Sequence, residues 1–331
     1  MVECGIYMTN TSLNPVCTFC NGPLTMKFPG GPERFDKAYD VYFCNTCAIG
    51  ATIPAPSLAE LDGLYASESY RTASGVRFHK PLERLIYLFR LGRKRRIEQY
   101  SKKGRVLDIG CGRGLFLALM RTGGWDAAGT EFNEETASYA SRAYGLDVKS
   151  GGPSQWGFPD ESFDVITLHH ALEHIPDPAE MIGTCRRLLK KGGLLVIAVP
   201  NMSSLQAAAG KGAWFHLDVP CHLYHFSEAG LAGLLKKHSF SIARIRRFDI
   251  EQGPFGWIQT LLNRSGIRRN LFYNLLKTPA LRKRALAEAL KTDIVYTLML
   301  LPLYIPLSFV LSLVESFLLK RGGTVEIYAV K

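Results

Sequence analysis

Acidic residues are scarce in this chain of 331 residues, where 29 Asp and Glu stand against 40 Lys and Arg and leave a formal net charge of +11. This excess predicts an anionic partner, such as nucleic acid, phospholipid or a phosphorylated substrate. Residues 1–5 also lack the basic-then-apolar pattern that opens a signal peptide, which argues against secretion. With 47% hydrophobic residues, the chain has enough apolar side chains for one large domain or two smaller ones.

A glycine-rich turn lies between an apolar strand and an apolar helix. Residues 106–114 read VLDIGCGRG, and residues 115–120 continue as the helix. Only glycine lets a backbone bend this tightly and approach a ligand without a Cβ in the way. A second short strand, residues 126–130, ends beside Glu131, whose carboxylate is placed to hold a ribose diol. This order of strand, turn, helix, strand and acid predicts a nucleotide cofactor site.

The details of the turn favour a cationic cofactor over a dinucleotide. A dinucleotide site requires the spacing GxGxxG, but the third glycine here, Gly114, comes one residue early. Asp108 lies in the strand just before the turn. A buried carboxylate there would repel a diphosphate but would stabilise a cationic amino group or sulfonium. These features point to S-adenosylmethionine.

The chain therefore resembles the class I S-adenosylmethionine-dependent methyltransferases, especially those that modify sugars or act in the ubiquinone pathway. Three further segments carry the resemblance: residues 158–168 as the fourth strand with its approach loop, residues 169–178 after it, and residues 188–201 leading into the fifth strand. The match runs from residue 104 to about residue 249 and includes the final strand. It implies an α/β fold with a Rossmann-like sheet of seven strands.

The resemblance also implies a set of cofactor-binding residues. Gly110 and Gly112 would pass the methionine part of S-adenosylmethionine, with Asp108 near its amino group. Glu131 would bind the ribose hydroxyls, and Phe132 would contact the adenine. The full predicted set is Asp108, Gly110, Cys111, Gly112, Gly114, Glu131, Phe132, Gln155 and His169.

Three members of this set have less direct roles. His169 would lie beside the methionine end of the cofactor. Gln155 is included because residues 151–156 lack the acid that often faces the adenine amine, so that this contact falls to Gln155 or to a backbone carbonyl. We expect Cys111 to fill space within the turn rather than to act as a reactive thiol.

Two CxxC pairs near the N-terminus predict a metal site. Cys17 and Cys20 form the first pair, Cys44 and Cys47 form the second, and 23 residues separate the pairs. Two such pairs can place four thiolates tetrahedrally around zinc, and a four-thiolate site leaves no open position for catalysis. A redox dithiol would instead usually place one CxxC at a helix start. Because turn residues and a strand-like segment lie between the pairs, we expect a zinc ribbon with a structural Zn²⁺.

These features divide the chain into five expected segments. They are a zinc ribbon (1–56), a helical linker with a basic helix (57–103), the S-adenosylmethionine-binding core (104–250), a basic amphipathic and hydrophobic helical insert (251–320) and the final core strand (321–331). Ser57 and Glu60 have the spacing of a capping box. The basic helix, residues 80–101, either packs its apolar stripe on the domain or faces acidic lipid headgroups.

The insert contains a long apolar run, residues 294–319, whose one charge is Glu315. Its length is sufficient to cross a bilayer. However, the resemblance places the strands before and after the insert side by side, and basic residues flank both ends of the run, which favours the cytoplasmic side for each. Because Pro302 and Pro306 should break a helix, we expect a helical hairpin that dips into the cytoplasmic leaflet. A buried cap or an oligomer interface is the alternative.

Histidines provide the candidates for catalysis. An O-methyl transfer needs the accepting hydroxyl deprotonated, and histidine is the usual base near neutral pH. His170, His222 and His225 are the candidates, because they follow strands whose ends form the ligand-binding edge. A histidine bonded to its own loop is an equally common arrangement. As in ubiquinone-pathway relatives, His170, Glu173 and His174 could also hold a divalent cation from one helical face, although we favour a structural role for Glu173 and His174.

Together these features favour a methyltransferase that modifies a hydroxyl on a sugar or a lipid-linked glycan. We expect peripheral or monotopic attachment to the inner face of the cytoplasmic membrane, with a homo-oligomer also compatible. The ribbon and positive charge would equally suit an RNA methyltransferase. Against nucleic acid, the Asn-Pro-Pro-aromatic motif of amino-group methylation and an obvious cysteine nucleophile for C5 chemistry are missing. The intact glycine turn and Glu131 argue against a non-catalytic protein.

Overall fold

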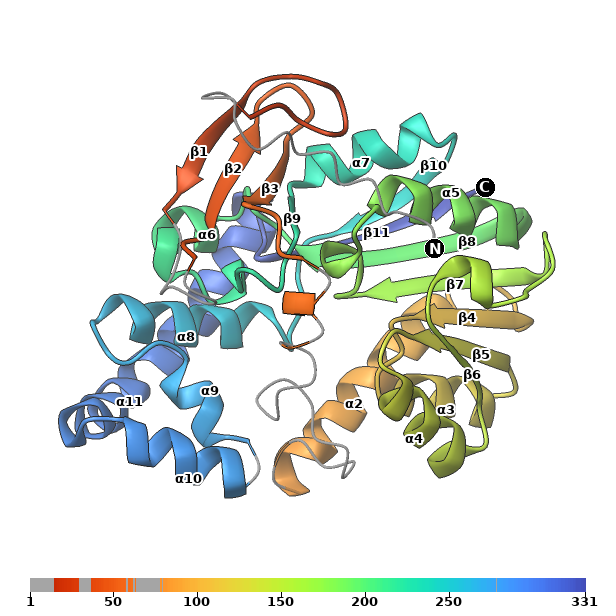
Figure 1. Ribbon diagram of the computed structural model, residues 1–331. Coiled ribbons are helices and arrows are strands. Elements are labelled where there is room, and N and C mark those ends of the chain that lie inside the picture. Colours follow the sequence, from red (N-terminus) through yellow and green to blue (C-terminus); the bar gives the residue numbers. More distant parts are fainter. Residues whose placement is uncertain are drawn as a thin grey trace.

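The computed structural model of the chain describes residues 15–29, 37–57, 59–61, 63, 78, 80–277 and 279–331. A large sheet with helices on both faces lies beside a smaller sheet, and a group of helices extends from the large sheet on one side (Figure 1). Cys4, which belongs to neither CxxC pair, lies outside the described residues.

The large sheet has seven strands in the order β10-β11-β8-β7-β4-β5-β6. They are β4 (Arg105–Ile109), β5 (Asp126–Glu131), β6 (Asp147–Ser150), β7 (Phe163–His169), β8 (Leu189–Pro200), β10 (Ser241–Arg246) and β11 (Thr324–Val330). β11 runs antiparallel to β8 and β10, and the other neighbours are parallel. The predicted Rossmann-like sheet is confirmed, including the strands on either side of the insert as neighbours.

Helices cover both faces of this sheet. α2 (Lys80–Ile97), α3 (Leu115–Thr122) and α4 (Glu134–Tyr144) lie on one face, and α5 (Pro178–Leu188) and α7 (Glu228–Lys237) lie on the other (Figure 1). The central strands β4 and β7 consist mostly of buried apolar residues, as expected for parallel strands covered on both sides. Their carboxyl ends, with the loops that follow, form the edge where ligands bind in open α/β sheets.

The smaller sheet contains the predicted ribbon and one strand from elsewhere. β1 (Leu24–Phe28), β2 (Asp40–Cys44) and β3 (Ile49–Ile53) are antiparallel, and β9 (Tyr224–Phe226) pairs with β3 as the fourth strand. The predicted capping box after the ribbon is confirmed, since the Glu60 amide donates to Ser57 Oγ over 3.2 Å and the Ser57 amide donates to the Glu60 carboxylate over 2.7 Å.

The insert is helical, but its apolar run is not a hairpin. Its helices are α8 (Gly253–Arg264), α9 (Leu271–Leu275), α10 (Pro279–Glu288) and α11 (Lys291–Leu313), and α11 continues as a π-helix through Leu318. Pro302 and Pro306 lie inside α11 and do not break it. A proline has no N–H to donate to the carbonyl four residues earlier in the helix. Because Pro302 and Pro306 are four residues apart, the carbonyl left without a donor by Pro306 is that of Pro302, and the two missing hydrogen bonds lie in adjacent turns. Packing of α11 along α8, through Leu301 and Tyr304, stabilises the continuous helix.

Candidate functional site

The glycine turn after β4 adopts the left-handed backbone that its residue type predicts. Gly110, Gly112 and Gly114 have φ values of 74°, 56° and 78°. A Cβ on Gly112 would meet nothing within 4 Å, so open space lies in front of it. A Cβ on Gly114 would lie only 3.0 Å from the Ala140 Cβ, so this glycine permits α4 to pack closely. Gly112 therefore faces the ligand side of the turn, and Gly114 serves the packing behind it.

Glu131, at the end of β5, points its carboxylate at this turn. The residue is buried, and its carboxylate accepts hydrogen bonds from the Gly112 amide over 2.9 Å and from the Asn133 amide over 3.2 Å. The neighbouring Phe132 is exposed. An acid fixed beside a glycine turn, with an exposed ring next to it, is the arrangement that a ribose and an adenine require.

Asp108 lies on the other side of the turn, within a buried chain of polar groups. Its Oδ1 accepts a hydrogen bond from Thr167 Oγ1 over 2.6 Å and lies 3.9 Å from His169 Nδ1. His169 Nε2 in turn lies 3.7 Å from a carboxylate oxygen of Glu326. Burial would raise the pKa of Glu326, but His169 and Arg96 outweigh this effect and hold the pKa at about 2. His169 thus lies between two carboxylates at the end of β7.

His170 follows β7 in a left-handed conformation, with φ 52°, and approaches a buried acid. Its Nδ1 lies 3.5 Å from Glu173 Oε1. Burial would raise the pKa of Glu173, but the neighbouring rings of His170 and His174 hold the pKa at about 2, so Glu173 is anionic at neutral pH. The prediction that His170, Glu173 and His174 share one helical face is wrong, because only Leu172–His174 are helical and His170 precedes that short turn.

His222 approaches Glu173 from the other side. Ligand atoms of Glu173, His174 and His222 all lie within 4.8 Å of one another, a donor set that suits a divalent cation. His174 Nδ1 lies 2.9 Å from the Cys221 carbonyl, and His222 Nδ1 lies 3.0 Å from the His216 carbonyl. Burial lowers the pKa of His174 to about 4, so its ring is neutral at neutral pH. The loop after β8 therefore reaches the segment after β7.

His225 has a different environment from the other two candidate bases. It lies within β9, its ring is buried, and Nε2 is 3.0 Å from Thr52 Oγ1. Burial lowers the pKa of His225 to about 3. A ring in this position supports the ribbon and is not placed to take a proton from a substrate.

Comparison with known proteins places these features in a family. Residues 82–244 match the family model of a methyltransferase domain. The ubiquinone biosynthesis O-methyltransferase of Methylococcus capsulatus is 35% identical over 105 residues, which cover 30% of this chain and 44% of that protein. A probable S-adenosylmethionine-dependent methyltransferase of Mycolicibacterium smegmatis is 27% identical over 141 residues, which cover 41% of this chain and 52% of that protein. The chain thus spans about half the length of these relatives.

The chain carries a class I S-adenosylmethionine-dependent methyltransferase domain. Among solved structures, an S-adenosylmethionine-dependent methyltransferase from Archaeoglobus fulgidus is similar with a TM-score of 0.46 and 22% identity, over 74% of this chain and 93% of that one. The strand order of the sheet itself identifies the fold.

The methyltransferase domain fits its cofactor at most of the predicted positions. The open space at Gly112, the buried carboxylate of Glu131 and the exposed ring of Phe132 would receive the nucleoside, and Asp108 would face the amino group. The side-chain oxygen of Gln155 accepts a hydrogen bond from the Gly152 amide over 3.1 Å, and its contact with the adenine stays a prediction. Cys111 packs against Gly129, which agrees with a space-filling role.

The four cysteines of the ribbon form one cluster. Their sulfur atoms lie within 4.8 Å of one another, with Cys17 Sγ 3.4 Å from Cys47 Sγ and Cys20 Sγ 3.5 Å from Cys44 Sγ. Four converging thiols from two turns suit tetrahedral zinc and leave no open coordination position. The cluster therefore fits a structural Zn²⁺.

Sequence reasoning missed a buried ion-pair network beside the cofactor site. Arg90 and Arg93 of α2 both reach Glu251, which lies just before α8, and the Arg93 to Glu251 separation is 3.7 Å. Burial would raise the pKa of Glu251, but the two arginines hold it at about 2. The three-residue spacing of the arginines indicates one helical face, but their acidic partner lies more than 150 residues later in the chain.

Proposed function

We propose that the protein transfers the methyl group of S-adenosylmethionine to a hydroxyl of a sugar or lipid-linked glycan at the cytoplasmic face of a membrane. The observation that carries the chemistry is the pair of His170 and Glu173 next to the glycine turn. Bound S-adenosylmethionine supplies an electrophilic methyl group. The names of the O-methyltransferase relatives support oxygen as the acceptor atom.

The protein's own task is to remove the hydroxyl proton, and His170 is the base best placed for it. A Cβ on Gly110 would lie 2.8 Å from the Ala171 Cβ, so the segment that carries His170 packs directly on the glycine turn. The anionic Glu173 carboxylate lies 3.5 Å from His170 Nδ1 and favours the tautomer that carries its proton on Nδ1, which leaves Nε2 as the basic nitrogen. Within the described residues, this buried Nε2 has no hydrogen-bond partner, so it can accept the proton.

The catalytic part of the proposal is tested with His170→Asn, because asparagine tolerates the left-handed backbone at this position. We expect methyl transfer to a polyprenyl diphosphate-linked disaccharide to fall about 100-fold or more, with S-adenosylmethionine affinity unchanged. Full activity of the variant would exclude His170 as the base. Transfer to an RNA transcript by the wild type, without transfer to the lipid-linked sugar, would replace the glycan acceptor by RNA.

The membrane part of the proposal rests on the inverted polarity of α11. Its buried side includes Thr297, Ser308 and Ser312, while large apolar side chains face outward. The exposed ones are Val295, Tyr296, Leu298, Met299, Leu303, Ile305, Leu307, Phe309, Val310, Leu313, Phe317 and Leu318. Within the described residues, one helix, Lys291–Leu318, is long and apolar enough to cross a membrane. A soluble helix would bury these apolar residues, so this face needs an apolar partner.

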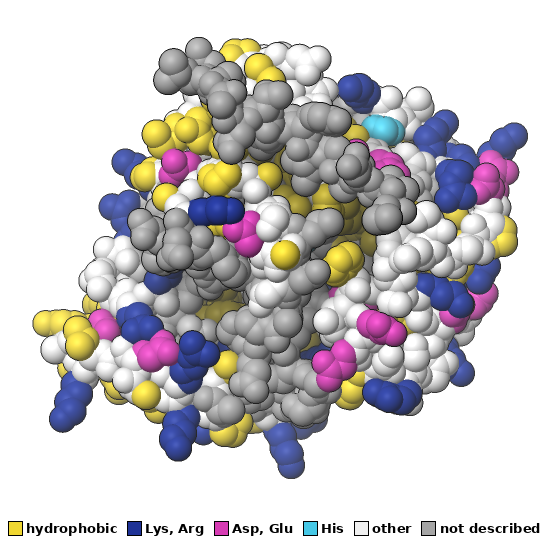
Figure 2. All heavy atoms as spheres, viewed as in Figure 1, with side chains coloured by type: hydrophobic (Ala, Val, Ile, Leu, Met, Phe, Trp, Pro, Cys, Tyr) yellow, Lys and Arg dark blue, Asp and Glu magenta, His cyan; other side chains and the backbone are white. Residues whose placement is uncertain are grey.

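The two ends of the helix favour docking in the plane of the membrane over crossing. Glu315 is fully buried and accepts hydrogen bonds from the Gln206 amide over 3.1 Å and the Gly323 amide over 3.0 Å. The C-terminal end of the helix is thus fixed inside the fold and cannot leave it to cross a bilayer. Basic side chains border the lower-left edge where α10 and α11 lie (Figure 2), which suits anionic headgroups.

Vesicle flotation tests this docking. We expect the wild type to float with vesicles that contain phosphatidylglycerol and to bind phosphatidylcholine vesicles more weakly. Leu298→Asp/Met299→Asp should reduce binding about tenfold or more, because it places two charges in the apolar face. The matched control is Leu85→Asp/Leu88→Asp, which places two charges at exposed leucines of the basic helix α2. A wild type that stays unbound and dimeric would assign the face to a second copy of the chain.

A further inference from the structure

The zinc ribbon and the loop over the cofactor edge are parts of one sheet. We call residues 214–227 the acceptor loop. Its strand β9 pairs with β3 of the ribbon, with His225 opposite Gly50. The Thr52 amide donates to the Leu223 carbonyl over 3.0 Å, and Ser227 Oγ donates to the Ala48 carbonyl over 2.6 Å. The ribbon therefore holds this loop along its whole second half.

One ribbon hydroxyl contacts both histidines at the end of the acceptor loop. Thr52 is buried, and its Oγ1 donates to the His222 carbonyl over 2.6 Å and lies 3.0 Å from His225 Nε2. On the opposite side, the Leu223 amide donates to the Glu173 carbonyl over 2.8 Å. The loop is thus held between the ribbon and the segment that carries His170 and Glu173. Thr52 fixes the backbone of His222, whose ring lies near Glu173.

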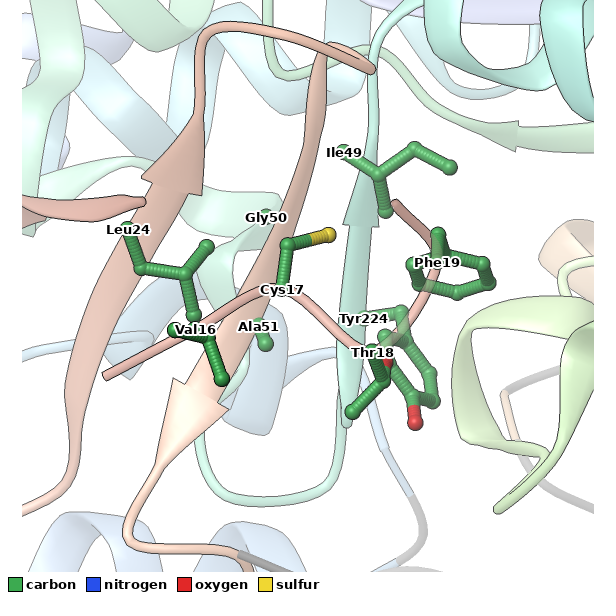
Figure 3. Close-up of a pocket in the computed structure, with 9 residues that line it drawn as sticks. All are labelled: Val16, Cys17, Thr18, Phe19, Leu24, Ile49, Gly50, Ala51 and Tyr224. Carbon is green, nitrogen blue, oxygen red and sulfur yellow. The ribbon is translucent and has the colours of Figure 1, made fainter. Parts of the chain in front are cut away.

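The first zinc turn itself packs on the acceptor loop. Phe19, which lies between Cys17 and Cys20, contacts the Tyr224 ring edge-on with centroids 5.2 Å apart. Figure 3 shows the two rings next to each other, beside Cys17. The Tyr224 hydroxyl donates to the Pro176 carbonyl over 3.1 Å, just past the segment of Glu173. Phe19 and Tyr224 therefore connect the cysteine cluster to the segment that follows Glu173.

We propose that the zinc ribbon is a positioning element of the acceptor site, and that Thr52 is the residue through which it places His222. This inference rests on the proposed function, which identifies the site as the one that binds the methyl acceptor. Within the described residues, the contacts of Gly112 with Glu131 and of Asp108 with Thr167 join strands and turns of the large sheet, without a residue of the ribbon. The ribbon should accordingly affect use of the acceptor and leave S-adenosylmethionine binding unchanged.

The test compares Thr52→Val, which removes the hydroxyl but keeps the side-chain shape, with Thr52→Ser, which keeps the hydroxyl. Thr25→Val is the matched control, because Thr25 Oγ1 donates to the Phe43 carbonyl, which also belongs to the ribbon. For Thr52→Val we expect amide exchange in residues 222–226 to accelerate about tenfold, and kcat/KM for a polyprenyl diphosphate-linked disaccharide to fall by a similar factor. For Thr52→Ser and Thr25→Val, the exchange rates and kcat/KM should stay within about twofold of the wild-type values.

Two results would overturn the inference. One is unchanged exchange of residues 222–226 in Thr52→Val, and the other is an equal loss of S-adenosylmethionine affinity by calorimetry, which would indicate general unfolding. The exchange measurement needs no acceptor. A chain that fails to methylate the disaccharide but shows the exchange effect therefore refutes the proposed function while keeping the ribbon as the scaffold of the loop.

Discussion

The glycine turn of the cofactor site and the acceptor loop are held by contacts of very different range. The hydrogen bond from Gly112 to Glu131 joins residues 19 positions apart. In the acceptor loop, Thr52 bonds to His222 across 170 positions. A short motif can specify the first kind of site, whereas the second depends on how distant segments pack. Changes on one side should therefore leave the other largely intact, and the first two predictions below test this separation.

The largest expected effect is on cofactor binding. Glu131→Ala removes the buried carboxylate that faces the glycine turn. We expect S-adenosylmethionine affinity to fall about 100-fold or more, because the two ribose hydroxyls would lose their charge-assisted hydrogen bonds to this carboxylate. Calorimetry measures this, with Glu134→Ala at the start of α4 as the control. Exchange of the acceptor loop should not change. Unaltered affinity would refute the assignment of Glu131.

The next effect is on turnover alone. Glu173→Gln keeps the shape of the side chain but removes the charge that orients His170, so we expect kcat to fall about 100-fold. Single-turnover methyl transfer measures this rate, and Glu180→Gln in the first turn of α5 is the control. S-adenosylmethionine affinity should remain that of the wild type. A variant that loses cofactor affinity instead would show that the two sides are not separate here.

A third prediction concerns the buried ion pair between α2 and the segment before α8. The pKa of Glu251 falls from 4.5 to about 2 on folding, so its stabilisation is present above pH 4.5 and is lost as the pH falls from 4.5 towards 2. The free energy of unfolding of the wild type should exceed that of Glu251→Gln by about 3 kcal/mol at pH 7. Urea titrations should show that the difference in unfolding free energy between the wild type and Glu251→Gln shrinks as the pH falls from 4.5 towards 2. A difference that is independent of pH would contradict the assigned ionisation.

The smallest effect tests the docking of the ribbon. A Cβ on Gly230 of α7 would lie 2.4 Å from the Ala48 carbonyl oxygen, whereas a Cβ on Gly233 of the same helix meets nothing within 4 Å. We expect Gly230→Ala to destabilise the fold by about 1–3 kcal/mol and Gly233→Ala to stabilise it by about 0.5–1 kcal/mol. Thermal unfolding measures both. Equal effects of the two variants would show that the ribbon does not pack against α7.

Sequence reasoning predicted best where contacts are local. The glycine turn, the acid at the end of β5, the cysteine pairs and the order of the strands follow from short motifs, and the structure contains them. It failed where a distant segment decides the outcome. Packing on α8 keeps α11 continuous through Pro302 and Pro306. β3 supplies the partner for β9, so His225 supports the ribbon, a role that its sequence neighbours do not indicate.

The most direct test of the account is transfer of labelled methyl from S-adenosylmethionine to isolated membranes, followed by separation of lipid-linked glycans from RNA. With the wild-type protein, the account predicts label in the glycan fraction that resists mild base, as expected for a methyl ether. His170→Asn should abolish this label while still binding the cofactor. Label confined to RNA, or equal glycan labelling by both proteins, would contradict the account.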